Sequence, residues 1–265
     1  QKYRSALREL VSGQPAPASP PLPLTHITES IRLEAILMER QLKPFPCSVF
    51  GDSRLYTFYA RPAYRGTKEG PLHNINFAPV CFIVDASVTE QQWPIEVFPF
   101  DTGALSAGIL SHHIHKDLSP FDFALDPKIS SAQQLVGAFF GSERNYYIGT
   151  PSQTVKLTYP PTDAELVAYE SLVRRSGRGP EDERGTSIEL QFKDPLPLEG
   201  KVLAIVLPQE FLDLPDICQA LKKEKIHPIP YPFIPDHSIK EFVGAFYSTV
   251  GDFYFRRKKR YGWQW

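Results

Sequence analysis

The chain has 265 residues, a formal net charge of −1 at pH 7 and a hydrophobic share of 42%. This length is sufficient for one large domain with a substantial core. The near-zero net charge excludes recruitment of nucleic acid by a global positive field, so any such binding requires a local patch. The 26 prolines, roughly twice average usage, argue against a helical bundle.

The three cysteines, Cys47, Cys81 and Cys218, form no CxxC motif and no close pair. A sparse, odd set predicts a reducing compartment and no structural zinc site. The sequence contains no signal-peptide core, and its apolar runs all fall short of the roughly 20 residues that span a bilayer. We therefore expect a cytoplasmic protein without a membrane partner.

The N-terminal segment ends in GQPAPASPPLP, a composition that favours polyproline conformation. We therefore expect an arm or linker over residues 1–23 and one domain over 24–265. The domain opens with a predicted strand, LTHIT, and a helix, ESIRLEAILMERQ, which Thr28 or Ser30 can cap. The aromatic and β-branched runs RLYTFYARP (54–62) and APVCFIVDAS (78–87) predict two strands, the second covered on both faces.

The segment over 91–155 is predicted to be irregular, apart from a helix around SAQQLVGAFFG (131–141). TDAELVAYESLVRR (162–175) predicts a helix with a capping box between Thr162 and Glu165. SIELQF and KVLAIVLP predict strands that a proline-glycine turn separates, and ICQALKKEKI predicts a short helix. HPIPYPFIP then leads into a final helix and the tail FRRKKRYGWQW. This mixture predicts an α+β fold, and the absence of GxGxxG and P-loop motifs argues against classical nucleotide sites.

Three side chains are candidates for chemistry. His26 lies in the first strand between two threonines, where it is either a satisfied core residue or a ring that bonds a ligand hydroxyl. Arg61 ends an aromatic strand beside Pro62, where it either stacks as a buried structural cation or grips a phosphate. Glu189 alternates with apolar residues on a strand and is either solvated or catalytic. Its position after a basic loop favours the catalytic interpretation, because loops often present catalytic groups to a second substrate.

The order of these residues resembles the ADP-ribosyltransferase superfamily, and most closely the bacterial DarT-type toxins. The resemblance rests on HITESIRLEAILMERQLKP, FYARPAYR, PVCFIVD, SIELQFKDPLPLEGKVLAIVLP and IHPIPYP, which cover residues 24–85 and 185–232. It implies a split antiparallel β core with peripheral helices, and NAD as co-substrate.

The resemblance also implies roles for single residues. His26 would bond a ribose hydroxyl of NAD, and Thr28 would hold the nicotinamide end. Arg61 would grip the pyrophosphate or the nicotinamide-side ribose and take part in catalysis. Tyr59 or Tyr64 would stack on the nicotinamide. Glu189 would be catalytic, because a carboxylate stabilises the oxocarbenium-like centre that forms when nicotinamide leaves the ribose.

The loop over 174–185 is the predicted acceptor-recognition element, with Arg174, Arg175, Arg178 and Arg184 as candidate phosphate contacts. The alternative is a solvated loop, because three acidic residues partly cancel its charge. The resemblance implies a toxin or anti-phage defence effector, with an antitoxin as a candidate partner. We expect the acceptor to be nucleic acid (DNA or RNA) or, alternatively, protein. An inert NAD-fold binding module and an NAD-dependent RNA 2′-phosphotransferase are the rival functions.

Two further clusters allow two interpretations each. His112, His113 and His115, with Asp117, have ligand types that suit a metal, but adjacent histidines point apart, which favours a polar loop. The tail FRRKKRYGWQW has cations and aromatics that suit nucleic acid. Alternatively, its cations complement a helix C-terminus and its tryptophans pack on the body of the domain.

Overall fold

The computed structural model describes residues 5–15, 17–64, 70–153, 159–175 and 183–265. Its main sheet has eight strands in the order β10-β9-β5-β1-β4-β7-β6, with β3 paired to β4. The strands are β1 (Leu24–Glu29), β3 (Phe45–Pro46), β4 (Ser53–Tyr59), β5 (Pro79–Val84), β6 (Glu96–Phe98), β7 (Glu189–Phe192), β9 (Val202–Pro208) and β10 (His227–Tyr231). Strand β10 runs parallel to β9, whereas the other neighbours in this sheet are antiparallel. The short strands β2 (Gln41–Leu42) and β8 (Leu196–Pro197) pair separately.

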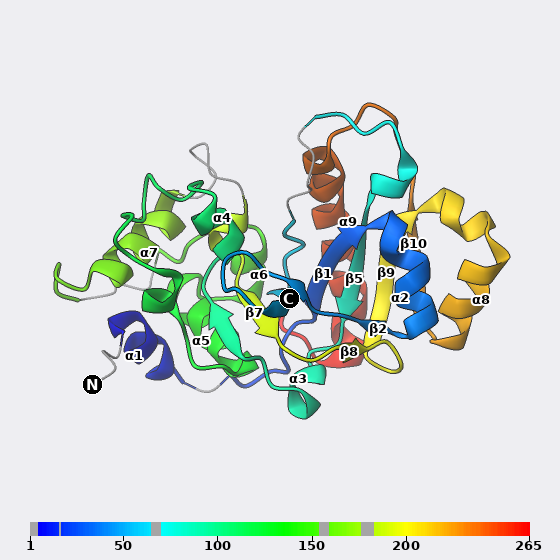
Figure 1. Ribbon diagram of the computed structural model, residues 1–265. Coiled ribbons are helices and arrows are strands. Elements are labelled where there is room, and N and C mark those ends of the chain that lie inside the picture. The colour runs from blue at the N-terminus through cyan, green and yellow to red at the C-terminus, as the bar shows by residue number, and fades with distance from the viewer. Residues whose placement is uncertain (1–4, 16, 65–69, 154–158, 176–182) are drawn as a thin grey trace.

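Helices surround the sheet on several sides, which confirms the predicted α+β class (Figure 1). In Figure 1, α8 lies beyond the β9–β10 edge, and α1, α5 and α7 gather around the other end of the molecule. The α-helices are α1 (Ala6–Ser12), α2 (Leu33–Glu39), α3 (Val88–Gln91), α4 (Thr102–Ser106), α5 (Ile129–Phe139), α6 (Glu143–Tyr147), α7 (Ala164–Arg175), α8 (Pro215–Lys223) and α9 (Ile239–Tyr261). The short 3₁₀ helices are η1 (Ser30–Arg32), η2 (Ile75–Phe77), η3 (Pro120–Phe123), η4 (Glu183–Thr186) and η5 (Gln209–Asp213). No described helix combines the length and the apolar character that a membrane span needs.

The sheet is partly split between its central strands β1 and β4, which stay paired at one end and diverge at the other. Strand β1 pairs with β5 along all six of its residues, from Leu24↔Val84 to Glu29↔Pro79. Strand β1 pairs with β4 through only Leu24↔Tyr59 and Thr25↔Phe58. Beyond these two pairs the strands are no longer partners, which confirms the split antiparallel core.

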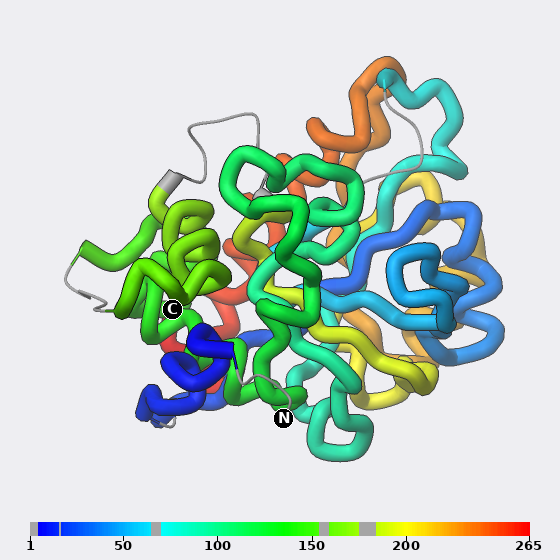
Figure 2. Tube along the Cα trace, turned by 60° about the vertical axis from the view of Figure 1, so that its left-hand side comes forward, coloured from blue at the N-terminus to red at the C-terminus, as the bar shows by residue number. Residues whose placement is uncertain are grey.

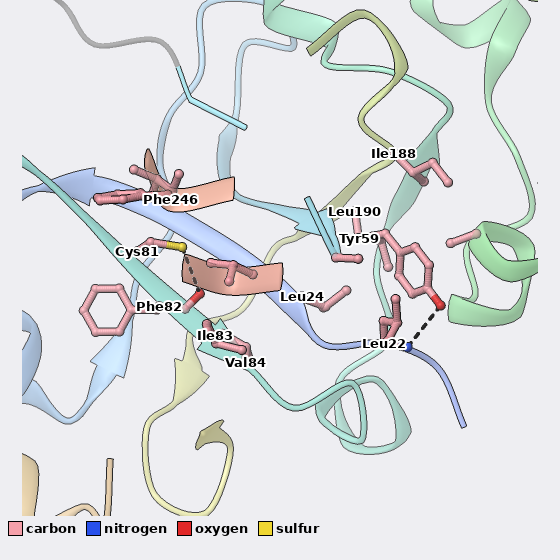
Figure 3. Packing of buried hydrophobic residues seen from close by; sticks show 14 of the residues in the cluster. Leu22, Leu24, Tyr59, Cys81, Phe82, Ile83, Val84, Ile188, Leu190 and Phe246 are labelled. Atoms are coloured by element: carbon pink, nitrogen blue, oxygen red, sulfur yellow. Dashed lines mark hydrogen bonds between the residues drawn. The ribbon is translucent and has the colours of Figure 1, made fainter. Parts of the chain in front are cut away.

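Strand β5 is the apolar centre of the half of the sheet that β10, β9, β5 and β1 form. All six of its residues are buried, as the continuous run VCFIV predicts for a strand that is covered on both faces. Helix α9 packs against it through an apolar stripe that includes Phe246 (Figure 3). Figure 3 also shows Leu22 beside Tyr59, whose hydroxyl oxygen accepts a 3.1 Å bond from the Leu22 N–H.

The N-terminal segment, expected to be an arm, contains helix α1. Its Leu7 and Val11 are one helical turn apart and fully buried, and the helix packs against α5 and α7. In Figure 2 this blue segment lies beside the green part of the chain that holds α5. The side-chain amide of Gln134 donates to the carbonyl of Gln14, and that of Gln133 donates to the carbonyl of Ser19. The proline-rich connector is therefore fixed to the domain at several points.

Two residues that were predicted to cap helices, Ser30 and Glu165, form hydrogen bonds with other partners. Ser30 does not cap the helix after β1, because its hydroxyl donates to the carbonyl of Ala78 at 2.8 Å. Glu165, predicted to close a capping box, accepts from the N–H of Ala6 at 2.7 Å and so caps α1 instead. The middle segment, predicted to be irregular apart from one helix, also contains β6, α4 and α6. Tertiary partners, which sequence spacing does not reveal, decide these cases.

We expect Leu7→Ala to lower the free energy of unfolding by about 2–5 kcal/mol, because it leaves a cavity between α1 and α5. Met38→Ala removes a side chain that is 76% exposed and serves as the control with little effect. Urea denaturation with a helix-sensitive signal measures both. Equal midpoints for Leu7→Ala and the parent would mean that α1 is not docked in solution.

Candidate active site

A cavity of about 510 Å³ opens where β1 and β4 diverge. We call it the split-sheet cavity. It is lined from β1 and η1 on one side, and from β3, the turn after β3, the second half of β4 and the segment after β4 on another. The start of α4, η4 and the start of β7 line its end. The lining residues are His26, Ile27, Thr28, Glu29, Arg32, Phe45, Pro46, Cys47, Ser48, Val49, Tyr56, Phe58, Ala63, Tyr64, Asp101, Gly103, Arg184 and Glu189.

Glu189 is the most deeply buried acid among the described lining residues of this cavity, at 1% exposed. Strand β7 lies between β4 and β6, so Glu189 is paired with Phe58 on one side and Phe98 on the other. The solvated alternative for this residue is therefore wrong. One carboxylate oxygen accepts from the hydroxyl of Thr102 at 2.8 Å and the other from its N–H at 3.2 Å.

Burial and, after it, the nearby carboxylate of Asp101 raise the pKa of Glu189 to about 8, although the hydrogen bonds from Gln191 and Thr102 act in the opposite direction. Arg184 lies 4.0 Å from Asp101 and offsets part of this repulsion. A carboxyl with such a pKa is mostly protonated at neutral pH. A cation placed beside it would favour the charged form.

A chain of hydrogen bonds fixes the orientation of the Glu189 carboxylate. Arg54, which is held by Asp52 at 2.7 Å and stacks 3.8 Å above the ring of Phe50, donates to the side-chain carbonyl of Gln191. The Gln191 carbonyl oxygen is therefore occupied, so its NH₂ group faces Glu189 and donates to it. Because side chains alternate along a strand, Glu189 and Gln191 share one face of β7.

The ring of His26 bridges the gap between the diverging strands. Its Nδ1 lies 2.7 Å from the carbonyl oxygen of Tyr56, which can only accept, so Nδ1 carries the proton. Burial lowers the pKa of His26, which keeps the imidazole neutral near pH 7. In this tautomer Nε2 is an acceptor that can bond a ligand hydroxyl. Thr28 and Tyr64, also predicted to bind the ligand, line the same cavity.

Arg61 lies outside the described lining of the cavity. Its guanidinium is buried, with Nη1 donating to the hydroxyl of Thr186 at 2.6 Å and Nη2 to the carbonyl of Tyr146. The guanidinium carbon lies 4.4 Å from the centre of the Tyr146 ring. This is the geometry of the structural, stacked cation that the sequence left as an alternative. Its location results from Ala60, whose φ of 57° turns the chain inward directly after β4.

Tyr59 is also absent from the described lining. Its hydroxyl donates to Glu143 at 2.7 Å, and its ring is fully buried beside Tyr146. The aromatic residue that the sequence offered as an alternative to Tyr59, Tyr64, is therefore the one that the structure brings to His26, Thr28 and Glu189.

The arginines of the predicted acceptor loop are placed differently from one another. Arg184 is 5% exposed and lines the cavity. Arg174 lies on the surface of α7 and forms a 2.6 Å ion pair with Glu170, one helical turn away. Arg178 and the side chain of Arg175 lie outside the described residues, as does most of the loop between them and Arg184.

Several residues that line the cavity or bond to Glu189 were not predicted from the sequence. Arg32 stands on η1, six positions after His26, and its guanidinium lies 4.2 Å from the centre of the Phe45 ring. Asp101 and Thr102 belong to the middle segment, whose structure the sequence left undefined. The one signal available in the sequence was Gln191, because its spacing of two from Glu189 places it on the same strand face.

The histidine cluster is dispersed by its surroundings. His113 Nδ1 lies 3.1 Å from the hydroxyl of Ser171, and His115 Nδ1 lies 3.5 Å from Asp117 on the surface. Among the described residues, no group of three metal-ligating side chains converges at this or any other place.

No family model matches the chain, and no curated protein matches it. Among solved structures, the chain is similar to Thermus sp. 2.9 DarT in complex with NAD+, with a TM-score of 0.38 and 14% identity over 82% of this chain and 96% of that chain. It is also similar to the same protein in complex with carba-NAD+, with a TM-score of 0.37 and 14% identity over 79% and 93%. A third structure, in complex with ADP-ribosylated ssDNA, has a TM-score of 0.37 and 13% identity over 84% and 98%. These structures belong to the family that the sequence resembles, and a likeness this distant assigns no role to any residue.

Proposed function

We propose that the chain is an NAD-dependent ADP-ribosyltransferase whose active site is the split-sheet cavity. The observation that carries this proposal is that a buried carboxyl, Glu189, and a neutral imidazole with a free acceptor nitrogen, His26, line one cavity. The volume of about 510 Å³ lies within the range of small-molecule and cofactor sites, roughly 300–1,000 Å³. Glu189 at one end of the cavity and the acceptor nitrogen of His26 on its wall can both bond ribose hydroxyls, so a ribose suits the space between them.

In this proposal Glu189 stabilises the positive charge that develops on the ribose as the bond to nicotinamide breaks. Its carboxylate also accepts a hydrogen bond from the 2′-hydroxyl. The nicotinamide ring of NAD is itself cationic, so its arrival beside Glu189 favours the carboxylate form in a site that otherwise keeps this group protonated. Gln191 and Thr102 hold the carboxylate in one orientation.

The other lining residues supply binding. His26 Nε2 accepts from a ribose hydroxyl, Thr28 contacts the nicotinamide end, and Tyr64 offers a ring face for stacking. The pyrophosphate needs a cation, and Arg61 is committed to Thr186 and Tyr146. We therefore assign the pyrophosphate to Arg32, which is exposed at the mouth of the cavity on the same wall as His26.

We extend the proposal to a nucleic acid acceptor and to a toxin or defence role, with an antitoxin as a partner. Arg184, inside the cavity, is the described arginine of the acceptor loop that is best placed to meet an incoming phosphate. A protein acceptor is the alternative, and mass spectrometry of nucleic acid and protein from expressing cells, searched for added ADP-ribose, distinguishes the two.

We expect Glu189→Gln to fold normally and to release nicotinamide from NAD at least about 100-fold more slowly, because preorganised charge stabilisation is lost. Glu34→Gln changes the same charge on the exposed surface of α2 and is the control. Nicotinamide release is followed by chromatography, and growth after induction provides a second readout, with arrest by the parent and by Glu34→Gln but not by Glu189→Gln. Parent-like release by a folded Glu189→Gln would remove Glu189 from the mechanism. Failure of the parent to release nicotinamide would leave an inert binding module.

The raised pKa of Glu189 predicts a pH dependence of kcat/KM for NAD. Because the reactive form is the carboxylate, kcat/KM rises with pH through about 8. Gln191→Leu removes a donor that favours the carboxylate, so we expect its rising limb to move up by roughly one pH unit. A limb that stays in place would mean that Gln191 does not act on Glu189.

The same shift has a consequence for stability with the opposite sign. The folded-state pKa lies above the unfolded value of 4.5, so the contribution of Glu189 is present below that value and is lost as the pH rises through about 8. The parent should therefore lose stability relative to Glu189→Gln over this range, as measured by thermal unfolding.

Arg32 and Arg61 should separate binding from folding. We expect Arg32→Ala to weaken NAD binding about tenfold or more, because a charge-assisted contact contributes roughly 1.5–3 kcal/mol, and to leave the melting temperature unchanged. Arg61→Leu should lower the melting temperature, because it leaves the buried Thr186 hydroxyl and Tyr146 carbonyl without the hydrogen bonds that Arg61 donates. Calorimetric titration of NAD and thermal unfolding measure both. The reverse result would restore Arg61 as the ligand of NAD.

A further inference from the structure

A second large hollow lies between strand β10 and the C-terminal half of helix α9. It has a volume of about 640 Å³ and shares no described lining residue with the split-sheet cavity. We call it the β10–α9 groove. Its floor and walls come from His227, Ile229 and Pro230 on the strand and from six residues of the helix.

The helix residues of the groove occupy one face of α9. Positions 249, 252, 253, 256, 257 and 260 follow the three-and-four spacing of a single helical stripe. A stripe that faces a neighbouring strand is normally apolar. At the other end of β10 this holds, because Tyr231 packs against the rings of Phe242 and Phe246 at 5.5 and 5.2 Å. At the His227 end the stripe becomes Arg256, Arg257 and Arg260, and the space stays open.

The groove is strongly positive although the chain as a whole has a net charge of −1. Its acidic lining residue, Asp252, pairs with Arg256 at 2.6 Å. Among the described residues, Arg257 and Arg260 have no carboxylate at ion-pair distance, and they lie 4.8 and 5.5 Å from the rings of Phe253 and Tyr261. Partial burial and the charge of Arg257 lower the pKa of His227, as expected beside uncompensated cations.

The strand side of the groove argues against a peptide occupant. Pro228 and Pro230 alternate along β10, and neither has an N–H group to donate. The ladder to β9 is continuous over all five residues of β10, so the prolines fall on its unpaired side. An added strand would find few donors there.

A membrane surface is also a poor fit. The site is concave, whereas lipid headgroups meet a convex or flat face with exposed apolar side chains. The exposed aromatic of this part of α9, Phe255, does not line the groove, and the ammonium group of Lys258 covers it at 4.3 Å from the ring centre. Planar guanidinium groups in a groove suit phosphate oxygens, which they can bond in pairs.

We propose that the β10–α9 groove binds the phosphate backbone of a single-stranded nucleic acid and anchors the acceptor strand away from the split-sheet cavity. This inference rests on the nucleic acid acceptor of the proposed function and adds a second contact surface to it. A single strand bends into a concave groove, and Lys259, between the groove residues Arg256 and Arg260 in the last turns of α9, adds to the positive charge of this end of the helix.

The test measures binding of a labelled 20-nucleotide single-stranded DNA, and of the RNA of the same sequence, by fluorescence anisotropy without NAD. We expect Arg256→Ala, Arg257→Ala and Arg260→Ala together to weaken binding about tenfold or more. They should also reduce the salt slope by roughly two units, about 0.7 for each phosphate that the variant no longer neutralises. Nicotinamide release with water as acceptor should not change. The control, Lys222→Ala with Lys223→Ala and Lys225→Ala, removes the same charge from the region of α8 and should bind as the parent does.

Parent-like oligonucleotide binding by the triple arginine variant would overturn the proposal, as would equal weakening by the lysine control. Binding of the parent to vesicles that contain phosphatidylserine, but to neither oligonucleotide, would also overturn it and assign the groove to lipid. The proposed function fails separately: it fails if the parent releases no nicotinamide, whatever the oligonucleotide result. If the parent releases nicotinamide but its oligonucleotide binding does not depend on the groove, the transferase function is supported and the proposed role of the groove is rejected.

Discussion

The two-pair ladder between β1 and β4 is the constraint on which the rest of the molecule depends. Thr25 reinforces it, because its hydroxyl donates to the carbonyl of Arg61 at 2.6 Å. A continuous ladder would satisfy the backbone groups of both strands and leave no space between them. Here the strands separate after the second pair, and the ring of His26 reaches across to the Tyr56 carbonyl that the absent ladder would otherwise leave without a donor. The divergence of β1 and β4 therefore both opens the sheet and frees the Tyr56 carbonyl that orients the imidazole.

Glu189 shows how a carboxyl can be held in place without being charged in advance. Burial between β4 and β6 and the nearby Asp101 both disfavour its ionised form, while Thr102 and Gln191 favour it by donating hydrogen bonds. The orientation is fixed by Gln191, whose own amide is oriented by Arg54. The group thus has its geometry before a ligand binds. Such preorganisation avoids rearrangement at the moment when charge develops.

The predictability of this site from the sequence depended on distance along the chain. The strands that carry His26 and Glu189 have clear alternation, so both elements and the side chains' neighbours within them were predictable. Arg61 was not, because a left-handed residue, Ala60, redirects the chain after an otherwise regular strand. Arg32 and Thr102 were missed for a different reason: only the tertiary fold brings Arg32 to the cavity and Thr102 to Glu189. The docked helix within residues 1–23 was missed because the prolines that dominate the composition of this segment all follow α1.

The docking of α1 bears on the order in which the chain can fold. Helix α1 packs on α5 and α7, and the N–H of Ala6 is bonded to Glu165, 159 residues later, so α1 has no surface to pack on until these later helices have been made. At a synthesis rate of roughly 5–20 residues per second, the apolar side chains of α1 remain uncovered for about ten to thirty seconds on the ribosome. A seven-residue helix is not stable by itself in water, so this segment stays unfolded in that interval. Helix α1 thus becomes ordered later than segments that pair with a near neighbour along the chain, and it is exposed to chaperones and proteases for longer than they are.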